Sequence, residues 1–357
     1  MSKRLILAIN PGSTSTKFAL FQEEYLVFEK TLRHTTEEIS GYSKITDQFQ
    51  FRKDLIMKEL VGRKIDFSEI TAVVGRGGLV KPIESGIYRV NEKMKNDLRN
   101  SPTGEHASNL GALIADDIAS SLPDAAAFIV DPVVVDELQP LARVSGHPAI
   151  ERISIFHALN QKAVARNYAA SIGRKYEELN LIVAHMGGGI SIGAHSMGKV
   201  IDVNNAFGGD GPFSPERSGG LPSNQLVDLC FSGRYTRPEI KTMLIGKGGM
   251  VAYLGTNNFK EVCEMAGKGD EKAILIRDAA SYQVAKEIGA MASVLKGNID
   301  AIILTGGMAF QESHVDTIKS MVGKFSRVVV FPGEDELRAL AFNCLLAMKK
   351  EMEIKEY

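Results

Sequence analysis

Two glycine-bearing segments of this sequence carry the residue types that bind phosphate. The first, residues 10–17, reads Asn-Pro-Gly-Ser-Thr-Ser-Thr-Lys and combines backbone N–H donors with amide, hydroxyl and ammonium groups. A tight turn of this composition can direct donors at phosphate oxygens, although taken alone it fits an ordinary polar hairpin equally well. The second, residues 187–189, is three successive glycines, which let a ligand approach the backbone closely. We therefore predict phosphate contacts from Asn10, Ser13, Ser15, Lys17, Gly187, Gly188 and Gly189.

A third glycine segment, Thr305-Gly306-Gly307, follows an apolar run and precedes a predicted helix. This geometry places N–H groups near a nucleotide at a helix start. The sequence has no GxxxxGKS or GxxxxGKT segment and no GxGxxG after its first strand, which excludes a Walker A loop and a dinucleotide fingerprint. Phosphate must therefore be held by another kind of turn.

The elements that would position these turns repeat along the chain. Residues 181–188 share the apolar run and terminal glycine of residues 5–12, at an offset close to half the chain, which indicates internal duplication. Alternating strands and helices predict an α/β fold with mixed sheets covered on both faces. We expect two duplicated βββαβα domains, 1–180 and 181–332, with a ligand cleft between them. A final helix in 333–357 is expected to pack back on the first domain.

In the first half we expect strands over residues 5–9, 17–21, 25–32, 70–74 and 126–130, and helices over 48–61, 107–121 and 155–172. In the second half we expect strands from 181 and over 190–195, 199–203, 301–304 and 328–331. The helices expected there cover 222–231, 237–244, 258–266, 271–295 and 334–350.

Composition narrows the class of partner. The 42 Lys and Arg residues balance 43 Asp and Glu residues, so the net charge of -1 provides no global field to attract nucleic acid or an anionic membrane. The three cysteines are far apart and lack CxxC spacing, which argues against a disulfide framework or a cysteine zinc site and favours a reduced, cytoplasmic compartment. No apolar run approaches the roughly 18 residues of a membrane span. We therefore predict a small-molecule partner.

Several further segments occur in the order found in one kinase family. They are the Asn-x-Gly-Ser-x-Ser-x-Lys start, Arg76 near Gly75, Phe156-His157, the His185-x-Gly-x-Gly turn, Arg217-Ser218-Gly219 and residues 334–337. Over essentially its whole length the chain resembles the acetate kinases, which belong to the superfamily of sugar kinases, actin-like chaperones and actin. It looks closest to the butyrate kinases, which carry the same opening octapeptide and the same His-Met-Gly-Gly-Gly-Ile-Ser.

This resemblance implies two actin-like domains and reversible, in-line phosphoryl transfer from ATP to a short-chain carboxylic acid with Mg²⁺. The transition state spreads charge over three phosphoryl oxygens, so cations and N–H donors must face them. The resemblance implies catalytic roles for Arg76, His157, Arg217 and Asp131, metal support from Asp131 and Glu336, and a nucleotide contact from His185. Glu334 is an alternative to Glu336, because the choice depends on a one-turn alignment, and a helix dipole alone also favours a first-turn glutamate.

Departures from the acetate kinase pattern concern the substrates. Gly77 and Gly78 stand where the acetate enzymes place two valines that wall a methyl-sized pocket. We expect a wider acyl pocket, lined by Gly77, Gly78 and Phe156, that accepts butyrate or a branched four- to five-carbon acid. Each additional buried methylene is worth about 0.8 kcal/mol, which sets a preference of several-fold per carbon.

The nucleotide end also departs from the acetate kinases. There, Asn258 replaces an aspartate next to Phe259, and Gly188 replaces an asparagine in the second glycine turn. We expect Asn258, Phe259, Gly306 and Gly307 to contact ATP or ADP.

Apolar helices such as 279–295 have more hydrophobic face than one core needs, which predicts a homo-oligomer. Two other functions stay open. An actin-like nucleotide-binding switch or filament protein would leave Arg76, Arg217 and His157 without a role. A phosphatase of the same superfamily would need a water-activating glutamate, for which Glu84 is the candidate near the first-half arginine.

Overall fold

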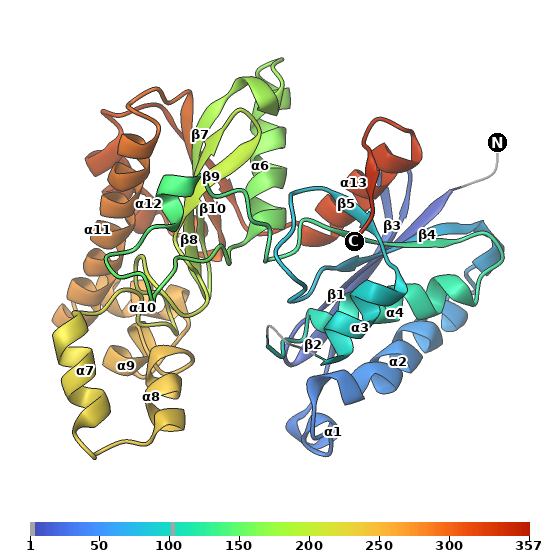
Figure 1. Ribbon diagram of the computed structural model, residues 1–357, viewed down its shortest axis with the longest axis horizontal. Coiled ribbons are helices and arrows are strands. Elements are labelled where there is room, and N and C mark those ends of the chain that lie inside the picture. The colour runs from blue at the N-terminus through green and yellow to red at the C-terminus, as the bar shows by residue number, and fades with distance from the viewer. Residues whose placement is uncertain (1–3, 101–103) are drawn as a thin grey trace. The chain divides into compact units, whose positions relative to one another are not determined.

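Two mixed β-sheets organise the chain, one in each of two structural units (Figure 1). A computed structural model describes residues 4–100 and 104–357. The first unit combines Met1–Val135 with Asp335–Tyr357, and the second is the continuous segment Asp136–Glu334. Each unit is described by itself.

The first sheet is built around an antiparallel meander of three strands. These are β1 (Leu5–Pro11), β2 (Ser15–Gln22) and β3 (Tyr25–Arg33). Strands β4 (Ile70–Arg76) and β6 (Ala126–Val130) continue the sheet parallel to β1. The short strands β5 (Ile87–Arg89) and β12 (Ile354–Lys355) complete the order β12-β5-β6-β4-β1-β2-β3.

Side chains alternate along β1 and so serve two faces of this sheet. Leu5, Leu7 and Ile9 join one hydrophobic cluster with residues of α2 (Phe49–Gly62), α3 (Glu92–Asn100) and α4 (Asn109–Ser120). Helix α13 (Glu336–Met348) packs on β1 and β4, and Figure 1 shows it on the opposite face from α2, α3 and α4. The short helix α1 (Thr36–Ser40) lies between β3 and α2 in the chain.

The second sheet repeats the core order of the first. Its strands are β7 (Asn180–Met186), β8 (Ile190–Ser196), β9 (Lys199–Val203), β10 (Ala301–Gly306) and β11 (Val328–Pro332). They run in the order β11-β10-β7-β8-β9, which matches β6-β4-β1-β2-β3 strand for strand. In both sheets the first three strands form the meander, and two further strands, β4 and β6 in the first sheet and β10 and β11 in the second, lie parallel to the first strand. The predicted α/β fold with duplicated halves is confirmed.

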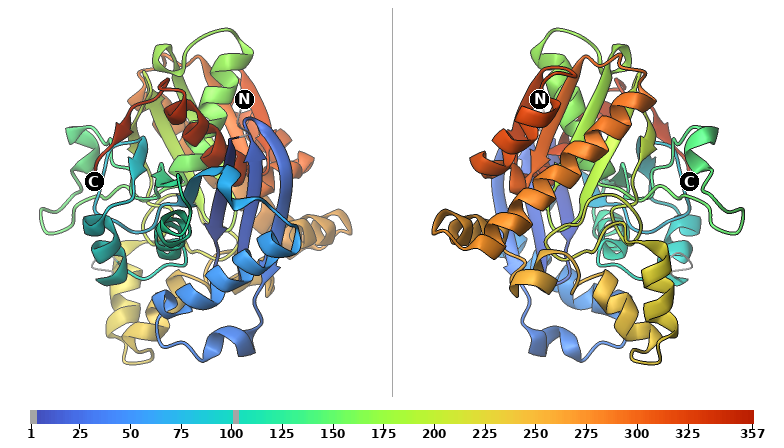
Figure 2. Two further views of the ribbon diagram at one scale, coloured as in Figure 1. Left: turned by 90° about the vertical axis from the view of Figure 1, so that its right-hand side faces the viewer. Right: turned by 90° about the vertical axis from the view of Figure 1, so that its left-hand side faces the viewer.

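Helices cover both faces of the second sheet. Leu181 and Val183 of β7 face α6 (Ala158–Ser171), whereas Ile182 and Ala184 face α11 (Glu271–Val294). The right-hand view of Figure 2 shows α11 lying across these strands. The unit also contains α5 (Pro140–Arg143), α7 (Ser223–Phe231), α8 (Arg237–Leu244), α9 (Met250–Leu254), α10 (Phe259–Gly267) and α12 (Glu312–Val322).

The boundary between the units differs from the expected one near residue 180. It falls after Val135, because α6 packs on β7 and β10 and therefore belongs to the second sheet. Helix α3 and strands β5 and β12 were not expected from the sequence. Among the described residues, none of the helices combines the length and the apolar character that a membrane crossing requires.

Candidate active site

Three predicted site residues meet at one edge of the first sheet. Asn10 and Arg76 lie at the carboxyl ends of the parallel neighbours β1 and β4, and Glu336 is the first residue of α13. Arg76 Nη1 lies 3.1 Å from Glu336 Oε2 and 3.4 Å from Asn10 Oδ1. Asn10 Nδ2 also donates to Glu336 Oε2. The strands extend two residues beyond their predicted ends, and this extension carries Asn10 and Arg76 to the edge.

The turn after β1, predicted to bind phosphate, is stabilised by Arg52, a residue that was not predicted from the sequence. Arg52 of α2 is completely buried and donates to the carbonyl oxygens of Gly12, Ser13 and Ser15 at 2.7–3.0 Å. It also bonds the Thr16 hydroxyl at 3.1 Å. Arg52 therefore fixes the backbone of the turn. Of the side chains predicted to meet phosphate there, Ser13 and Lys17 are exposed, Ser15 is half-buried and Asn10 is buried.

Arg52 also places a positive charge under this turn. Burial lowers the pKa of Arg52 to about 10, so its guanidinium remains protonated at neutral pH. Within the described residues no carboxylate forms an ion pair with it, and its remaining bonds go to the Gln48 side chain. The available sequence signal was spacing, because Arg52, Ile56 and Leu60 are the buried positions of α2 at intervals of four.

Asp131 is engaged in the backbone of its own unit. It has a positive φ of 37°, and its Oδ1 accepts from the Ser85 hydroxyl at 2.6 Å and from the Gly86 N–H at 2.8 Å. Its own N–H donates to the Gly86 carbonyl. The carboxylate thus closes the turn that leads into β5, which gives it a structural role whether or not it also supports a metal.

The residues proposed for Mg²⁺ support do not form a cage of their own. In the part of the chain that the structure describes, no three His, Cys, Asp or Glu side chains cluster as a metal site. Mg²⁺ in phosphoryl-transfer sites typically takes one or two carboxylates and completes its shell with water and substrate phosphates. The Glu336 carboxylate at the end of β1 and β4 is a ligand of that type, and Asn10 and Arg76 hold it in place through one of its two oxygens, Oε2. Glu334 belongs to the second unit.

Gly77 and Gly78 do not support the argument for a wider acyl pocket. A Cβ at Gly78 would lie 2.5 Å from Asn109 Oδ1 and 2.8 Å from Leu98 Cδ2, and a Cβ at Gly77 would lie 2.5 Å from Pro132 Cβ. Both directions lead into the packed interior of the first unit. These glycines are needed for close packing after β4, so the expectation that they enlarge a pocket is wrong in its physical reason.

In the second unit, two predicted histidines stack at the carboxyl end of β7. The rings of His157 and His185 have centroids 3.8 Å apart. His185 Nδ1 lies 2.8 Å from Asn160 Oδ1, and its Nε2 lies 3.1 Å from Glu334 Oε1, without the alignment of a hydrogen bond. His157 precedes α6 as its N-cap residue rather than lying in its first turn. The neighbouring Phe156 is 2% exposed and belongs to the core of the chain.

Two glycine turns lie at the same end of this sheet, one after β7 and one after β10. The Gly187 N–H donates to the Gly189 carbonyl at 3.0 Å, and the Ser214 hydroxyl donates to the Gly188 carbonyl at 2.6 Å. Gly306 has a φ of 89°, and a side chain there would collide with the backbone of Met186. Gly307 is exposed with open space at its Cβ position, which fits the close approach of a ligand.

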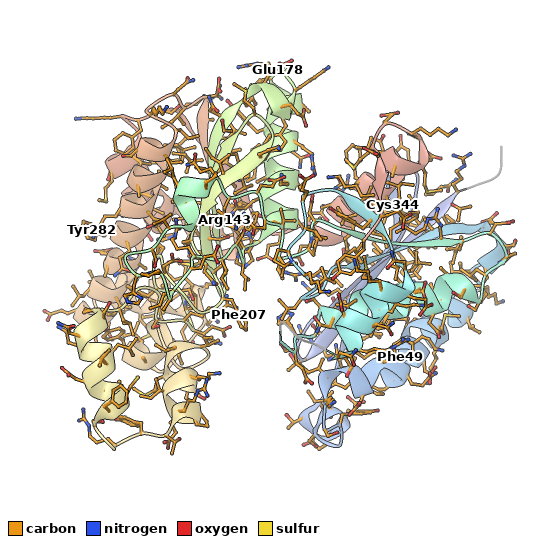
Figure 3. All side chains as sticks on the ribbon, in the orientation of Figure 1. Phe49, Arg143, Glu178, Phe207, Tyr282 and Cys344 are labelled. Atoms are coloured by element: carbon orange, nitrogen blue, oxygen red, sulfur yellow. The ribbon has the colours of Figure 1, made fainter. Side chains whose placement is uncertain are left out.

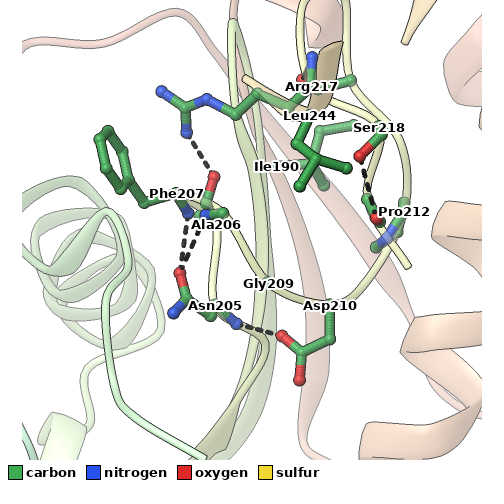
Figure 4. Close-up of a pocket in the computed structure, with 13 residues that line it drawn as sticks. Ile190, Asn205, Ala206, Phe207, Gly209, Asp210, Pro212, Arg217, Ser218 and Leu244 are labelled. Atoms are coloured by element: carbon green, nitrogen blue, oxygen red, sulfur yellow. Dashed lines mark hydrogen bonds between the residues drawn. The ribbon is translucent and has the colours of Figure 1, made fainter. Parts of the chain in front are cut away.

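Arg217 lies beside the glycine turn and lines a pocket formed by the loop after β9 (Figure 4). Its Nη1 donates to the Ala206 carbonyl, and its guanidinium lies 5.4 Å from the ring centroid of Phe207. Its buried Nε has no hydrogen-bond partner among the described residues, and burial lowers the pKa of the side chain. An unsatisfied, buried guanidinium N–H is a ready donor for a phosphate oxygen.

Asn258 and Phe259 have structural partners of their own. Asn258 is the N-cap of α10 and its side chain accepts from the Glu261 N–H. The Phe259 ring is 6% exposed and meets the His314 ring edge to face at 4.9 Å. Asn258 is exposed and accessible to a nucleotide, whereas Phe259 belongs to the core.

Comparison with known proteins gives a consistent picture. Residues 148–328 match the model of the acetokinase family. The fold is similar to an acetate kinase from Porphyromonas gingivalis (TM-score 0.77, 19% identity, 97% of this chain and 100% of that one). It is also similar to a propionate kinase from Francisella tularensis subsp. tularensis (TM-score 0.75, 21% identity, 96% and 99%). An acetate kinase from Entamoeba histolytica matches with a TM-score of 0.75, 16% identity and coverage of 98% and 99%. At these identities the structural likeness establishes the fold.

Proposed function

This chain belongs to the acetokinase family, and on that premise we propose that it makes butyryl phosphate, or the acyl phosphate of a branched four- to five-carbon acid. The family phosphorylates carboxylates with ATP, so the chain is a carboxyl-group phosphotransferase. In the proposed reaction a carboxylate oxygen attacks the γ-phosphorus in line. The bond to the β–γ bridging oxygen breaks, ADP leaves, and no enzyme nucleophile takes part.

The observation that carries the proposal is the donor set around the Gly187–Gly189 turn. Arg217 offers a buried Nε–H that has no hydrogen-bond partner in the described part of the chain, and the stacked His157 and His185 lie at the same strand end. Donors held rigidly before the substrate arrives need no reorganisation as negative charge moves onto the phosphoryl oxygens. In the first unit, we propose that Arg76 supplies a further cation from the end of β4.

Support for a four- to five-carbon acid comes from sequence motifs. The opening octapeptide of residues 10–17 and the His-Met-Gly-Gly-Gly-Ile-Ser of residues 185–191 resemble those of butyrate kinases. The packing around Gly77 and Gly78 gives no additional support for this choice.

We propose that Mg²⁺ accompanies the nucleotide and that Glu336 and Asp131 support it from the first unit. When bound, the ion would neutralise charge on the nucleotide phosphates. The chain's own part is to hold the Glu336 carboxylate beside Asn10 and Arg76, and to hold Asp131 beside Ser85.

A hydroxamate assay with ATP, Mg²⁺ and acetate, propionate, butyrate, isobutyrate or valerate tests the proposal. We expect acyl phosphate to be trapped, with the highest kcat/KM for butyrate or isobutyrate and loss of activity with EDTA that added Mg²⁺ restores. A maximum at acetate or propionate would overturn the choice of acid but keep the phosphotransferase. Phosphate release without any acid would instead favour a phosphatase or a nucleotide-gated switch.

We also propose that the chain forms a homo-oligomer. None of the described residues of α7 is buried, and its Phe231 is 87% exposed. On α11, Leu275 is 66% exposed and Tyr282 is 52% exposed, and Figure 3 shows Tyr282 on the outer side of the helix. We propose that these exposed apolar side chains belong to association surfaces. Light scattering after size exclusion should give a mass above 38.8 kDa, and a monomeric mass would contradict the proposal.

A further inference from the structure

A chain of hydrogen bonds runs through the interior of the second unit and ends at His157. Tyr176 Oη lies 2.7 Å from His195 Nδ1, and His195 Nε2 lies 2.9 Å from Gln161 Oε1. Gln161 Nε2 lies 2.8 Å from Ser191 Oγ, which lies 2.8 Å from His157 Nδ1. Gln161, Ser191 and His195 are completely buried, and Tyr176 is 3% exposed. Water therefore has no access to the middle members of this series of hydrogen bonds.

The direction of these bonds is determined first at Gln161. Its amide contacts the Ser191 carbonyl oxygen at 3.0 Å, and a carbonyl oxygen only accepts, so the atom facing it is Nε2. The amide oxygen must then face His195. Gly193 gives this amide its room, because a Cβ at that position would lie 2.6 Å from Gln161 Oε1. A glycine in the middle of a strand often marks such a close approach.

The same direction holds at His195. Burial, aided by the charges of Lys162 and Arg166, lowers the pKa of His195 well below its usual value, so the ring is neutral. A neutral imidazole has one N–H and one acceptor nitrogen. Nε2–H donates to Gln161 Oε1, and Nδ1 therefore accepts from the Tyr176 hydroxyl.

The donor-to-acceptor direction of these hydrogen bonds continues through Ser191 to His157. Ser191 Oγ accepts from Gln161 Nε2 at 2.8 Å and from the His157 backbone N–H at 3.4 Å, which occupies both lone pairs. Its own proton must then point to His157 Nδ1. A neutral His157 whose Nδ1 accepts carries its proton on Nε2.

We propose that Gln161 and Ser191, oriented by the buried His195, are positioning residues that hold His157 in its Nε2–H tautomer. In this form His157 presents an N–H donor to an oxygen of the transferring phosphoryl group. The opposite tautomer would present a lone pair to that oxygen and repel it. The expected effect on catalysis rests on the proposed phosphoryl transfer, whereas the assignment of the tautomer rests on the hydrogen bonds alone.

The variant Gln161→Glu keeps the size of the side chain but removes its donation to both the hydroxyl and the carbonyl oxygen of Ser191, which should reverse the hydrogen-bond chain. The carboxylate still accepts from His195 Nε2–H but no longer donates to Ser191, so the hydroxyl turns toward it. Ser191 Oγ then accepts from His157, which must move its proton to Nδ1. Long-range ¹H–¹⁵N correlation spectra of histidine-labelled protein at about pH 8, above the ordinary histidine pKa of about 6.5, report which ring nitrogen is protonated.

We expect Nε2–H at His157 in the unmodified chain and Nδ1–H in Gln161→Glu. The kcat of this variant should fall by about 10- to 100-fold, as for loss of one transition-state donor, with little change in the KM for ATP. Gln225→Glu, on the exposed face of α7, adds the same charge to the same unit and should change neither readout. Ser191→Ala should leave His157 as a mixture of tautomers.

Each outcome decides one step. A proton on Nδ1 in the unmodified chain would overturn the inference, whatever the activity. A tautomer change in Gln161→Glu with an unaltered kcat would overturn the positioning role. If Gln161→Glu does not fold, as judged by its thermal transition, Ser191→Ala provides the test, and a single Nε2–H tautomer in that variant would overturn the relay. Absence of carboxylate phosphorylation in the unmodified chain would refute the proposed function while the spectra still report on the tautomer.

Discussion

The imidazole rings of His157 and His185 stack with their centroids 3.8 Å apart and their planes 14° from parallel. Each ring is anchored from a different side, His157 through Ser191 and His185 through Asn160. Asn160 lies three residues after His157 on α6, so a single helix positions both rings against the end of β7. The pair therefore forms a rigid wall beside the Gly187–Gly189 turn.

Removing one of these rings tests whether it donates to the phosphoryl group. We expect His157→Ala to lower kcat by about 10²-fold, as for loss of a positioned donor or proton-transfer group. Steady-state kinetics with ATP and butyrate would measure it. His147→Ala serves as the control, because His147 is exposed in a loop of the same unit. Equal rates for the two variants would remove His157 from the reaction.

Arg217 is expected to act as a transition-state donor. Arg217→Ala should reduce kcat by about 10²-fold or more while the unfolding midpoint stays near that of the unmodified chain. The comparison variant is Arg237→Ala, which removes an exposed arginine at the start of α8. If Arg217→Ala changes the KM for ATP alone, the guanidinium contributes to uniform binding instead.

Arg52 should be needed for the shape of the turn after β1. Arg52→Met removes the side-chain donor from the carbonyl oxygens of Gly12, Ser13 and Ser15, although the Ser15 oxygen still accepts from the Gly12 N–H. A buried carbonyl left unsatisfied costs about 1–3 kcal/mol. We expect a lower free energy of unfolding in urea and a higher KM for ATP. Lys58→Met removes an exposed cation from the same helix and should do neither.

The strand-end residues were predictable because the pattern that positions them is local. An apolar run followed by polar or glycine residues marks the end of a buried strand, and this identified Asn10, Arg76 and the turn after His185. Gln161 was not found, because its contacts with Ser191 and His195 join α6 to β8 across about thirty residues. A pairing at that distance leaves no periodic signal in the sequence.

Gly77 and Gly78 illustrate a second limit of sequence reasoning. A missing side chain is read from sequence as free space, whereas here Asn109, Leu98 and Pro132 occupy that space. The predicted position of the boundary between the units, near residue 180, was wrong for a related reason. The repeat begins at β7, but helix α6, which precedes it, packs on that strand and belongs to the second unit.

Substitution of Gly78 should therefore affect folding. Gly78→Val places its side chain against Asn109 and Leu98, and overpacking of this kind costs about 1–3 kcal/mol. We expect a lower urea midpoint and no shift of preference from butyrate toward acetate. Gly62→Ala, at a position with open space around the added methyl, should not lower the midpoint. A folded Gly78→Val protein that prefers acetate would restore the pocket argument.

Acidification should destabilise the fold through a buried histidine. Burial lowers the pKa of His314 to about 4, against an ordinary value of about 6.5. As pH falls below about 6.5, His314 becomes protonated in the unfolded chain but stays neutral in the folded protein. Its contribution to the free energy of unfolding is therefore fully present above that pH and is lost progressively toward about pH 4. The full effect is about 3 kcal/mol. Buried His195, whose pKa is also lowered, acts in the same direction.

Urea unfolding between pH 7 and pH 5 checks this prediction. His314→Gln removes the titrating group, so its free energy of unfolding should depend less steeply on pH than that of the unmodified chain. Parallel slopes would show that His314 does not titrate differently in the folded and unfolded states.

The discontinuity of the first unit has a consequence for synthesis. Residues 1–135 emerge from the ribosome without α13 and β12, and the whole second unit must be made before residues 335–357 follow. At about 5–20 residues per second this delay is on the order of ten to forty seconds. During this delay one face of the first sheet is not yet covered by α13, and Arg76 lacks its ion-pair partner Glu336. Nascent chains in this interval should be the forms most dependent on chaperones.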